Sequence, residues 1–226
     1  MTRWSRIPQV LAMFALATLV AACAGNPPTP AWQGNARAAV DRAVAAYLAG
    51  DTRVADVEFE RARAEVARTG RPDLVARVEL VRCAVRAASL GFEPCERFDA
   101  LRADADAAER AYADYLAGRV LPQDIALLPP QHRAVAVQSA SVEVALEAAQ
   151  SIEDPLSRLV AIGVLFRSGR ASPSTIALAV DTASAQGWRR PLVAWLNVQL
   201  ELADKAGNAD EAERLRRRIG VALGSG

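Results

Sequence analysis

Residues 47–72 read YLAGDTRVADVEFERARAEVARTGRP, and this stretch decides the fold because it holds a helix end, a turn and one complete helix. Gly favours the residue just past a helix end, and Pro favours the first helical turn. A Gly followed closely by Pro, as at Gly70 and Pro72, therefore ends one helix and starts the next. Asp51 offers a side-chain oxygen to the free amides of the helix that follows it. The stretch predicts antiparallel helices joined by tight turns.

The same pattern of Gly and Pro at helix ends continues along the rest of the chain. It predicts nine helices, at residues 36–49, 52–69, 72–90, 94–117, 130–152, 155–168, 173–186, 191–206 and 209–222. Most of the turns between them are short, so neighbouring helices should run antiparallel. Aromatic residues make up only 5% of the sequence and Ala is abundant, which favours helices over sheets. We expect an all-α fold of stacked antiparallel helical hairpins.

Between Gly118 and Pro130 the regular alternation of long helices and short turns is interrupted. A short helical turn at residues 122–128 is expected there. This segment is the best candidate for a boundary between N-terminal hairpins, residues 35–118, and C-terminal hairpins, residues 119–226, that continue from them.

Apolar spacing indicates which helix faces are buried. We expect inward stripes on the first three helices at Val40, Val44, Tyr47 and Leu48, at Val54, Val57, Phe59, Ala62 and Val66, and at Leu74, Val78, Val81 and Val85. Two segments, Leu156–Phe166 and Leu192–Leu202, are apolar nearly all round, as in helices covered on several sides. The C-terminal half, including Trp195, is therefore predicted to hold the deepest core.

The first residues have the three-part plan of a secretory signal. Arg3 and Arg6 form a cationic head, Ile7–Val20 is largely apolar, and small residues precede Cys23. Spanning a bilayer core of about 30 Å requires about 20 apolar residues. The run is too short and too early to be taken as a stop-transfer helix, so we expect it to be removed.

The four residues Val20-Ala21-Ala22-Cys23 resemble the lipobox of bacterial lipoproteins. The resemblance implies that residues 1–22 are a signal peptide, that Cys23 becomes the acylated first residue, and that this covalent lipid anchors the chain. Ala24 in place of Asp implies the periplasmic face of the outer membrane. Residues 23–34 would then be the lipidated Cys and a Pro-rich tether. The alternative is an ordinary signal peptide in which Cys23 is incidental.

Export would place the two other cysteines, Cys83 and Cys95, in an oxidising compartment, where a disulfide is the expected state. The alternative is a redox or metal pair. Their spacing matches neither a Cys-x-x-Cys motif nor a zinc site, so we expect a structural disulfide.

Tyr-Leu-Ala-Gly occurs at residues 47–50 and again at residues 115–118, 68 residues later. That offset is twice the tetratricopeptide period of 34 residues. Ala55, Phe59 and Ala62 have a spacing similar to the second helix of such a repeat. Residues 119–153 depart from the pattern. The resemblance implies an α-solenoid with an extended concave binding surface.

No catalytic motif is present. His132 is the only histidine, and Ser139 and Ser141 lack the Gly-x-Ser-x-Gly context of a nucleophile. Near Pro129-Pro130, we expect His132 to be exposed or to cap the first turn of a helix. Neither a phosphate-binding loop nor a multi-His metal site exists in the sequence, so we expect no enzyme, no metal and no cofactor apart from the lipid on Cys23.

Without residues 1–22 the chain has 25 Lys and Arg against 26 Asp and Glu, because Arg3 and Arg6 leave with the signal. A net charge of −1 gives no reason to expect nucleic-acid binding. Two local sets of aromatic and basic residues could bind a partner: Trp188, Arg189 and Arg190, and Arg214, Arg216, Arg217 and Arg218. For the second set, complementing the helix macrodipole is the simpler role, and contact with a phospholipid or anionic glycan is the alternative.

These features predict a lipid-anchored scaffold that binds another cell-envelope protein through its helical repeats. One alternative is a periplasmic ligand-binding or structural helical domain. A further alternative is a cell-wall enzyme, for which no motif-bearing segment is left.

Overall fold

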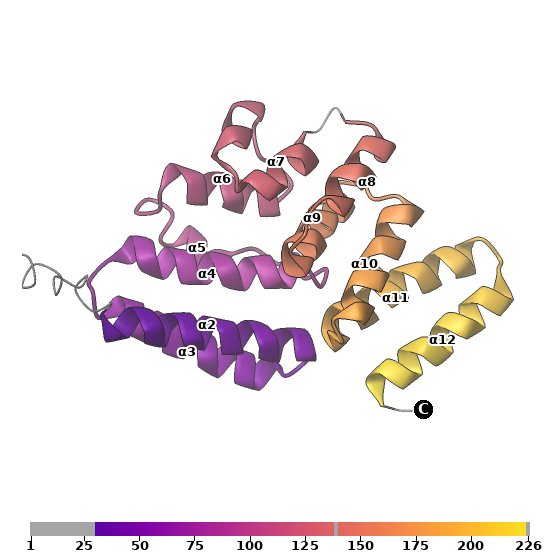
Figure 1. Cartoon of the computed structure of the whole chain (residues 1–226), viewed down its shortest axis with the longest axis horizontal. Helices are drawn as coiled ribbons and strands as arrows, with labels where there is room; N and C mark the ends of the chain where they lie inside the picture. Colours follow the sequence, from indigo (N-terminus) through magenta and orange to yellow (C-terminus); the bar gives the residue numbers. More distant parts are fainter. Residues whose placement is uncertain (1–29, 138–139, 225–226) are drawn as a thin grey trace, which may run out of the picture. The chain divides into compact units, whose positions relative to one another are not determined.

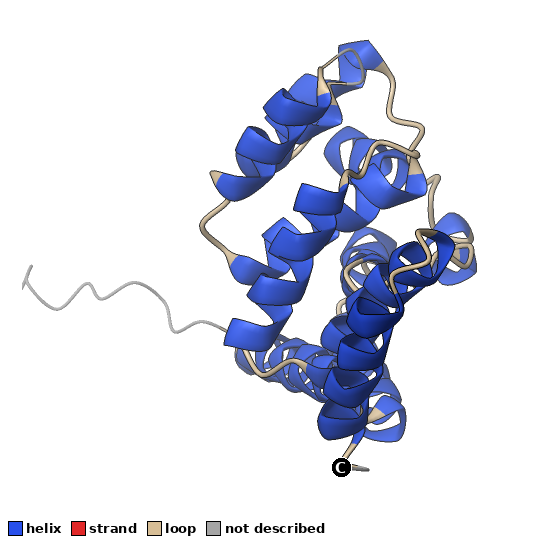
Figure 2. Ribbon diagram, turned by 90° about the vertical axis from the view of Figure 1, so that its right-hand side faces the viewer, coloured by secondary structure: helices blue, strands red, loops and turns tan. Residues whose placement is uncertain are grey.

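The computed structural model describes residues 30–137 and 140–224, which form helices and loops without a strand (Figures 1 and 2). Cys23 and the lipobox lie outside these residues. The elements are α2 (Ala31–Ala49), α3 (Thr52–Ala67), α4 (Pro72–Ala87), α5 (Glu96–Asp99), α6 (Ala107–Leu116), the 3-10 helix η2 (Pro122–Leu127), α7 (Pro130–Ala136), α8 (Val142–Gln150), α9 (Pro155–Arg167), α10 (Pro173–Ala185), α11 (Arg189–Lys205) and α12 (Ala209–Leu223). The all-α prediction is confirmed.

Two predicted helices are each divided. The helix expected at residues 94–117 is interrupted because Asp106 and Glu109 form a capping box that starts α6. The helix expected at residues 130–152 is interrupted because Ser141 accepts a hydrogen bond from the backbone N–H of Val144 and starts α8.

Two further predictions concern where the first helix begins and where the short helical turn lies. The first helix begins at Ala31, inside the segment expected to be a tether. The turn expected at residues 122–128 is η2, which packs against α6 and α7. Residues 32–226 form one compact unit, so the interruption at η2 does not divide it.

Packing joins helices that are distant in the sequence as well as neighbours. Successive pairs contact each other from α9 to α12, and α4 contacts α6 and α9. The largest apolar cluster draws buried side chains from α4 to α12, and a second cluster joins α2, α3 and α4.

The deepest packing lies around α4 and α9. All residues from Leu159 to Leu165 are buried, so the expectation for α9 is confirmed. The same expectation for α11 is wrong, because Leu202 is 41% exposed, although Trp195 is fully buried as expected. Since α11 packs mainly against α10 and α12, part of its surface remains open.

The prediction of a buried apolar stripe on α3 is also partly wrong. Val54 and Val57 are 44% and 54% exposed, whereas Phe59, Ala62 and Val66 are buried. The buried face of α3 is formed by Ala55, Phe59, Ala62 and Val66, and the last three share an apolar cluster with alanines of α2.

The C-terminal end of α4 is the junction between the two parts of the fold. A Cβ atom on Gly163 of α9 would lie 2.3 Å from the backbone oxygen of Ala87. Nearby, the indole N–H of the buried Trp195 donates to the backbone oxygen of Ala88 over 3.1 Å. The last carbonyls of a helix have no partner within it, and here α9 and α11 pack against them.

The predicted disulfide is present. Cys83 on α4 is bonded to Cys95, the residue before α5, with 6.0 Å between their Cα atoms. The loop that it closes also carries Phe92, whose backbone oxygen accepts a hydrogen bond from Arg167 of α9. Covalent and polar bonds therefore hold this loop beside the junction.

We predict that Gly163→Ala lowers the free energy of unfolding by about 1–3 kcal/mol, because the added methyl group overlaps a backbone atom that cannot rotate away. Gly34→Ala is the matched control, since Gly34 lies within α2 and a Cβ there meets nothing within 4 Å. The control should stabilise the fold by up to about 1 kcal/mol through helix propensity. Urea denaturation followed by circular dichroism measures both values, and equal effects of the two substitutions would contradict the role given to Gly163.

Candidate functional site

The largest apolar depression lies between α2 and α4, and we call it the α2–α4 groove. It has a volume of about 650 Å³ and is lined mainly by valine, leucine and alanine side chains. Leu156 from the start of α9 and Trp188 from the turn before α11 also line it. With Val66 of α3, five parts of the chain, α2, α3, α4, α9 and the turn before α11, therefore build one groove.

Two apolar stripes form its walls. Val40 and Val44 lie four residues apart on α2, and Leu74, Val78 and Val81 lie at helical spacing on α4. The alanines of α2 at positions 36, 39 and 43 are buried, whereas Val40 and Val44 are only half buried. Larger apolar side chains are thus left facing an open groove rather than a closed core.

Charged side chains occur only at the edge of the groove. Arg37 and Asp41 pair with each other over 3.4 Å, and their side chains are 82% and 63% exposed. Arg77 donates to Glu109 over 2.6 Å. The Arg37–Asp41 pair is exposed and therefore weak, so an apolar partner would displace it at little electrostatic cost. Glu109 is buried beside Arg77, so the second pair belongs to the fold.

Of the first predicted partner-binding set, Trp188 lines the groove, whereas the two arginines contact the end of α2. Arg189 donates to the backbone oxygen of Ala49 over 2.9 Å. Arg190 donates to the backbone oxygen of Tyr47 over 2.7 Å and lies 4.3 Å above its ring. Cations at a helix C-terminus are favourable. The two arginines therefore position the Trp188 turn rather than present a basic surface.

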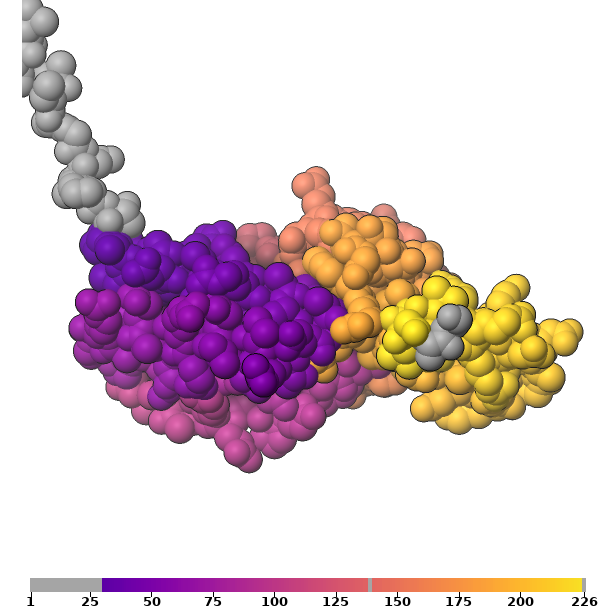
Figure 3. Space-filling view, turned by 90° about the horizontal axis from the view of Figure 1, so that it is seen from below, coloured from indigo at the N-terminus to yellow at the C-terminus, as the bar shows by residue number. Residues whose placement is uncertain are grey.

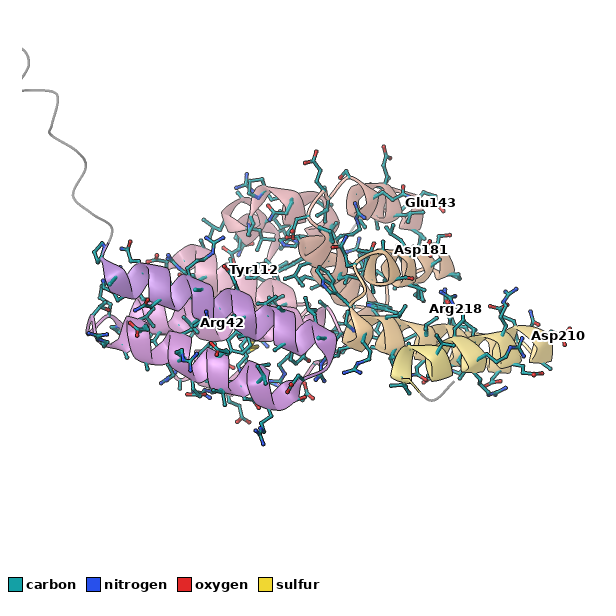
Figure 4. All side chains as sticks on the ribbon, turned by 60° about the horizontal axis from the view of Figure 1, so that its bottom comes forward. Arg42, Tyr112, Glu143, Asp181, Asp210 and Arg218 are labelled. Carbon is teal, nitrogen blue, oxygen red and sulfur yellow. A yellow bond between two sulfur atoms is a disulfide. The ribbon has the colours of Figure 1, made fainter. Side chains whose placement is uncertain are left out.

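The second predicted set divides in a similar way. Arg214, Arg217 and Arg218 line another depression, which we call the α12 groove, of about 390 Å³ between α10, α11 and α12. Its apolar lining includes Leu192, Leu196 and Val221. Arg216 lies elsewhere and pairs with Asp204 over 2.9 Å. Figure 4 labels Arg218 on α12, with Asp181 on α10.

A network of ion pairs joins α3, α4 and the segment around α5. Glu79 is only 3% exposed and contacts Arg63 at 2.7 Å and Arg97 at 3.2 Å. Hydrogen bonding to Arg97 lowers the pKa of Glu60. The arginines thus favour the charged form of Glu60, and the network links three segments of the fold.

His132 is buried, and its predicted exposed or capping position is wrong. It is 1% exposed and packs between Tyr112 and Tyr115, with ring centroids 5.5 Å and 5.2 Å away. Its Nδ1 lies 3.3 Å from the hydroxyl of Tyr115. Pro130 starts α7, and His132 in its first turn faces α6 instead of solvent. Burial lowers the pKa of His132 to about 4, so the ring is neutral at pH 7.

The remaining residues considered for catalysis are Ser139 and Ser141. Ser141 caps α8, and Ser139 lies outside the described residues. Within residues 30–137 and 140–224, three or more His, Cys, Asp or Glu side chains nowhere gather as metal ligands would. None of the helices in this part of the chain combines the length and apolarity needed to cross a membrane.

Comparisons with protein-family models, curated proteins and solved structures found no match to this chain. The two grooves and the N-terminal sequence are therefore the features that point to a function.

We predict that His132 makes the fold less stable as the pH falls. Its pKa is about 4 in the fold and 6.5 when unfolded, so the unfolded chain binds the proton more readily between these values. The contribution is complete above pH 6.5 and should fall by about 2 kcal/mol on going to pH 5. Urea denaturation gives the free energies of unfolding of the wild type and His132→Gln at pH 7.5 and pH 5, and comparing them isolates the contribution of His132. An identical pH dependence in both proteins would contradict it.

Proposed function

We propose that this protein is a membrane-anchored helical scaffold whose α2–α4 groove binds a helical segment of another cell-envelope protein. The groove itself is the observation that carries the proposal. It is open, apolar and about 650 Å³ in volume. Exposed apolar surface of this kind marks interaction sites in proteins that are otherwise well packed. No cofactor, metal or nucleic acid enters the proposal.

The walls of the groove favour a helix as its occupant. On α2 the lining runs from Ala36 to Leu48, a distance of about 18 Å at the helical rise per residue. Amphipathic helices present apolar side chains at three- and four-residue spacing and lie in grooves of this type. A partner helix of about three turns would match the lining of α2.

The N-terminal sequence supports an envelope location. The lipobox resemblance at Val20–Cys23 favours export and acylation at Cys23, and Ala24 favours the periplasmic face of the outer membrane. A disulfide between Cys83 and Cys95 is compatible with an oxidising compartment. Acyl chains at about 0.8 kcal/mol per buried CH₂ would anchor the chain without a spanning helix.

A periplasmic ligand-binding domain is the second candidate. The same groove volume of about 650 Å³ lies in the range of small-molecule pockets. A small apolar ligand would occupy the part near Trp188 and Leu156, whereas a helix would contact the full length of α2.

We predict that a photo-crosslinking residue at position 45, which lines the groove and is exposed, captures one protein in living cells. Val44→Asp should abolish this product, because a carboxylate in an apolar interface costs at least 2 kcal/mol, or about thirtyfold in affinity. Mass spectrometry of the crosslinked peptides should locate the contact in an amphipathic helix of the partner.

Val57→Asp is the matched control, since Val57 lies outside the groove and is 54% exposed on α3. It should leave the product unchanged. An unchanged product in Val44→Asp, or no product at all from position 45, would contradict the scaffold function. Loss of a small apolar molecule rather than a protein from Val44→Asp would favour the second candidate.

A further inference from the structure

The disulfide between Cys83 and Cys95 borders two depressions of the surface. Both cysteines line a depression of about 450 Å³ and a smaller one of about 110 Å³. Cys83 on α4 is only 8% exposed, whereas Cys95 is half-buried and lies between the exposed residues Pro94 and Glu96. Figure 3 shows the magenta part of the chain, where α4 is followed by α5, at the molecular surface. The sulfur of Cys95 is therefore the one that an external thiol meets first.

Residues 88–95, which we call the Phe92 loop, contain a strained backbone conformation. Leu90 has a φ of 61°, and within residues 30–137 and 140–224 it is the only residue other than Gly with a positive φ. The left-handed region is unfavourable for a residue with a Cβ, and other helix ends in this chain use Gly there, as at Gly50 and Gly118. The contacts around the Phe92 loop therefore hold it against its local preference, and the disulfide is the covalent one among them.

The Phe92 loop also contacts α9, and through α9 it is connected to α11. The ring of Phe92 lies 6.4 Å from that of Phe166, and Arg167 donates to the backbone oxygen of Phe92 over 3.2 Å. Phe166 packs edge-on against Trp195 at 5.6 Å. Because Phe92 is only half-buried and Arg167 is exposed, these contacts hold the loop weakly without a covalent bond.

We propose that the Cys83–Cys95 disulfide is a thiol-exchange site, at which a dithiol protein of the Cys-x-x-Cys class reduces it and releases the Phe92 loop from α9. A thiolate of the dithiol attacks Sγ of Cys95, and the electron pair of the broken bond leaves on Sγ of Cys83, which takes up a proton. The second thiolate of the dithiol then attacks the first in the mixed disulfide and releases Cys95, which is also protonated. The protein gains two electrons and two protons, and the dithiol becomes a disulfide.

Reduction favours release of the Phe92 loop because a strained backbone persists only while its surroundings hold it. Without the covalent bond Leu90 can leave the left-handed region, and Phe92 can then separate from Phe166. The contacts of Gly163 and Trp195 with the end of α4 do not involve the disulfide, so the chain should stay folded. The inference does not depend on what binds in the α2–α4 groove.

Trapping the mixed disulfide tests the exchange step. The full chain carries Cys23→Ser, so that Cys83 and Cys95 are its only cysteines. It is mixed in native buffer with a reduced thioredoxin-fold protein whose Cys-x-x-Cys motif is changed to Cys-x-x-Ser, and the reaction is quenched with acid. Mass spectrometry of non-reduced peptides should find the mixed disulfide on Cys95. Trapping on Cys83 instead, or no trapping in native buffer, would overturn the inference.

The substitution Ile162→Val distinguishes exchange in the folded chain from exchange after unfolding. Ile162 is fully buried on α9 and lines neither depression, and the change should raise the unfolded fraction by about twofold to tenfold. Reduction by dithiothreitol, followed by thiol titration, should nevertheless proceed at the same rate with and without the substitution, since Cys95 is reached in the folded chain. A rate that rises in proportion to the unfolded fraction would refute exchange at the folded surface.

Hydrogen exchange of the reduced chain tests release of the Phe92 loop. The amide of Gly91 donates to the backbone oxygen of Arg86 over 2.8 Å in the disulfide form, and its exchange should become at least tenfold faster after reduction. Amides of α12 should keep their rates. Replacing both Cys83 and Cys95 by Ser is the matched control, and it should reproduce the faster exchange without any reductant. Unchanged exchange at Gly91, or loss of the helical circular dichroism of the whole chain on reduction, would contradict a releasable loop.

Discussion

The close approach of α9 to the end of α4 is the constraint on which the rest of the structure depends. A side chain at Gly163 would overlap the backbone oxygen of Ala87, so only the absence of a Cβ lets the two helices meet there. Trp195 then donates to the next carbonyl, that of Ala88. Trp195 thus satisfies a carbonyl that the helix end leaves without a helical partner, whereas the oxygen of Ala87 accepts a hydrogen bond from the N–H of Leu90. The N-terminal hairpins and the C-terminal helices are joined at this point.

The α2–α4 groove follows from that junction. Its walls belong to α2 and α4, but Leu156 comes from α9 and Trp188 from the turn before α11. Arg189 and Arg190 fix this turn to the end of α2 through backbone oxygens. The groove therefore draws on both the N-terminal hairpins and the C-terminal helices, and neither set contains it alone. A groove built this way is preformed, which would reduce the ordering cost of binding a partner.

The sequence predicted where the helices lie better than which of their side chains are buried. Gly70, Pro72 and Asp51 indicate helix ends through local chemistry, and most predicted boundaries agree with the structure within a few residues. Asp106 and Ser141 were missed as caps because neither is next to a Gly or Pro that would mark a helix end. Burial depends on tertiary neighbours, so local sequence did not reveal that His132 is buried or that Val54 and Val57 are exposed. The valines of the groove have the same spacing as core valines, so the groove could not be distinguished from a core.

We expect the junction to make the helices from α4 to α12 one cooperative unit. Native-state hydrogen exchange at low urea concentrations tests this most directly, because it gives the opening free energy of each helix. Amides of α4 and α11 should exchange through a common opening, with equal free energies and equal urea dependence. A separate opening of α11 and α12, at lower free energy and with α4 still protected, would contradict the account.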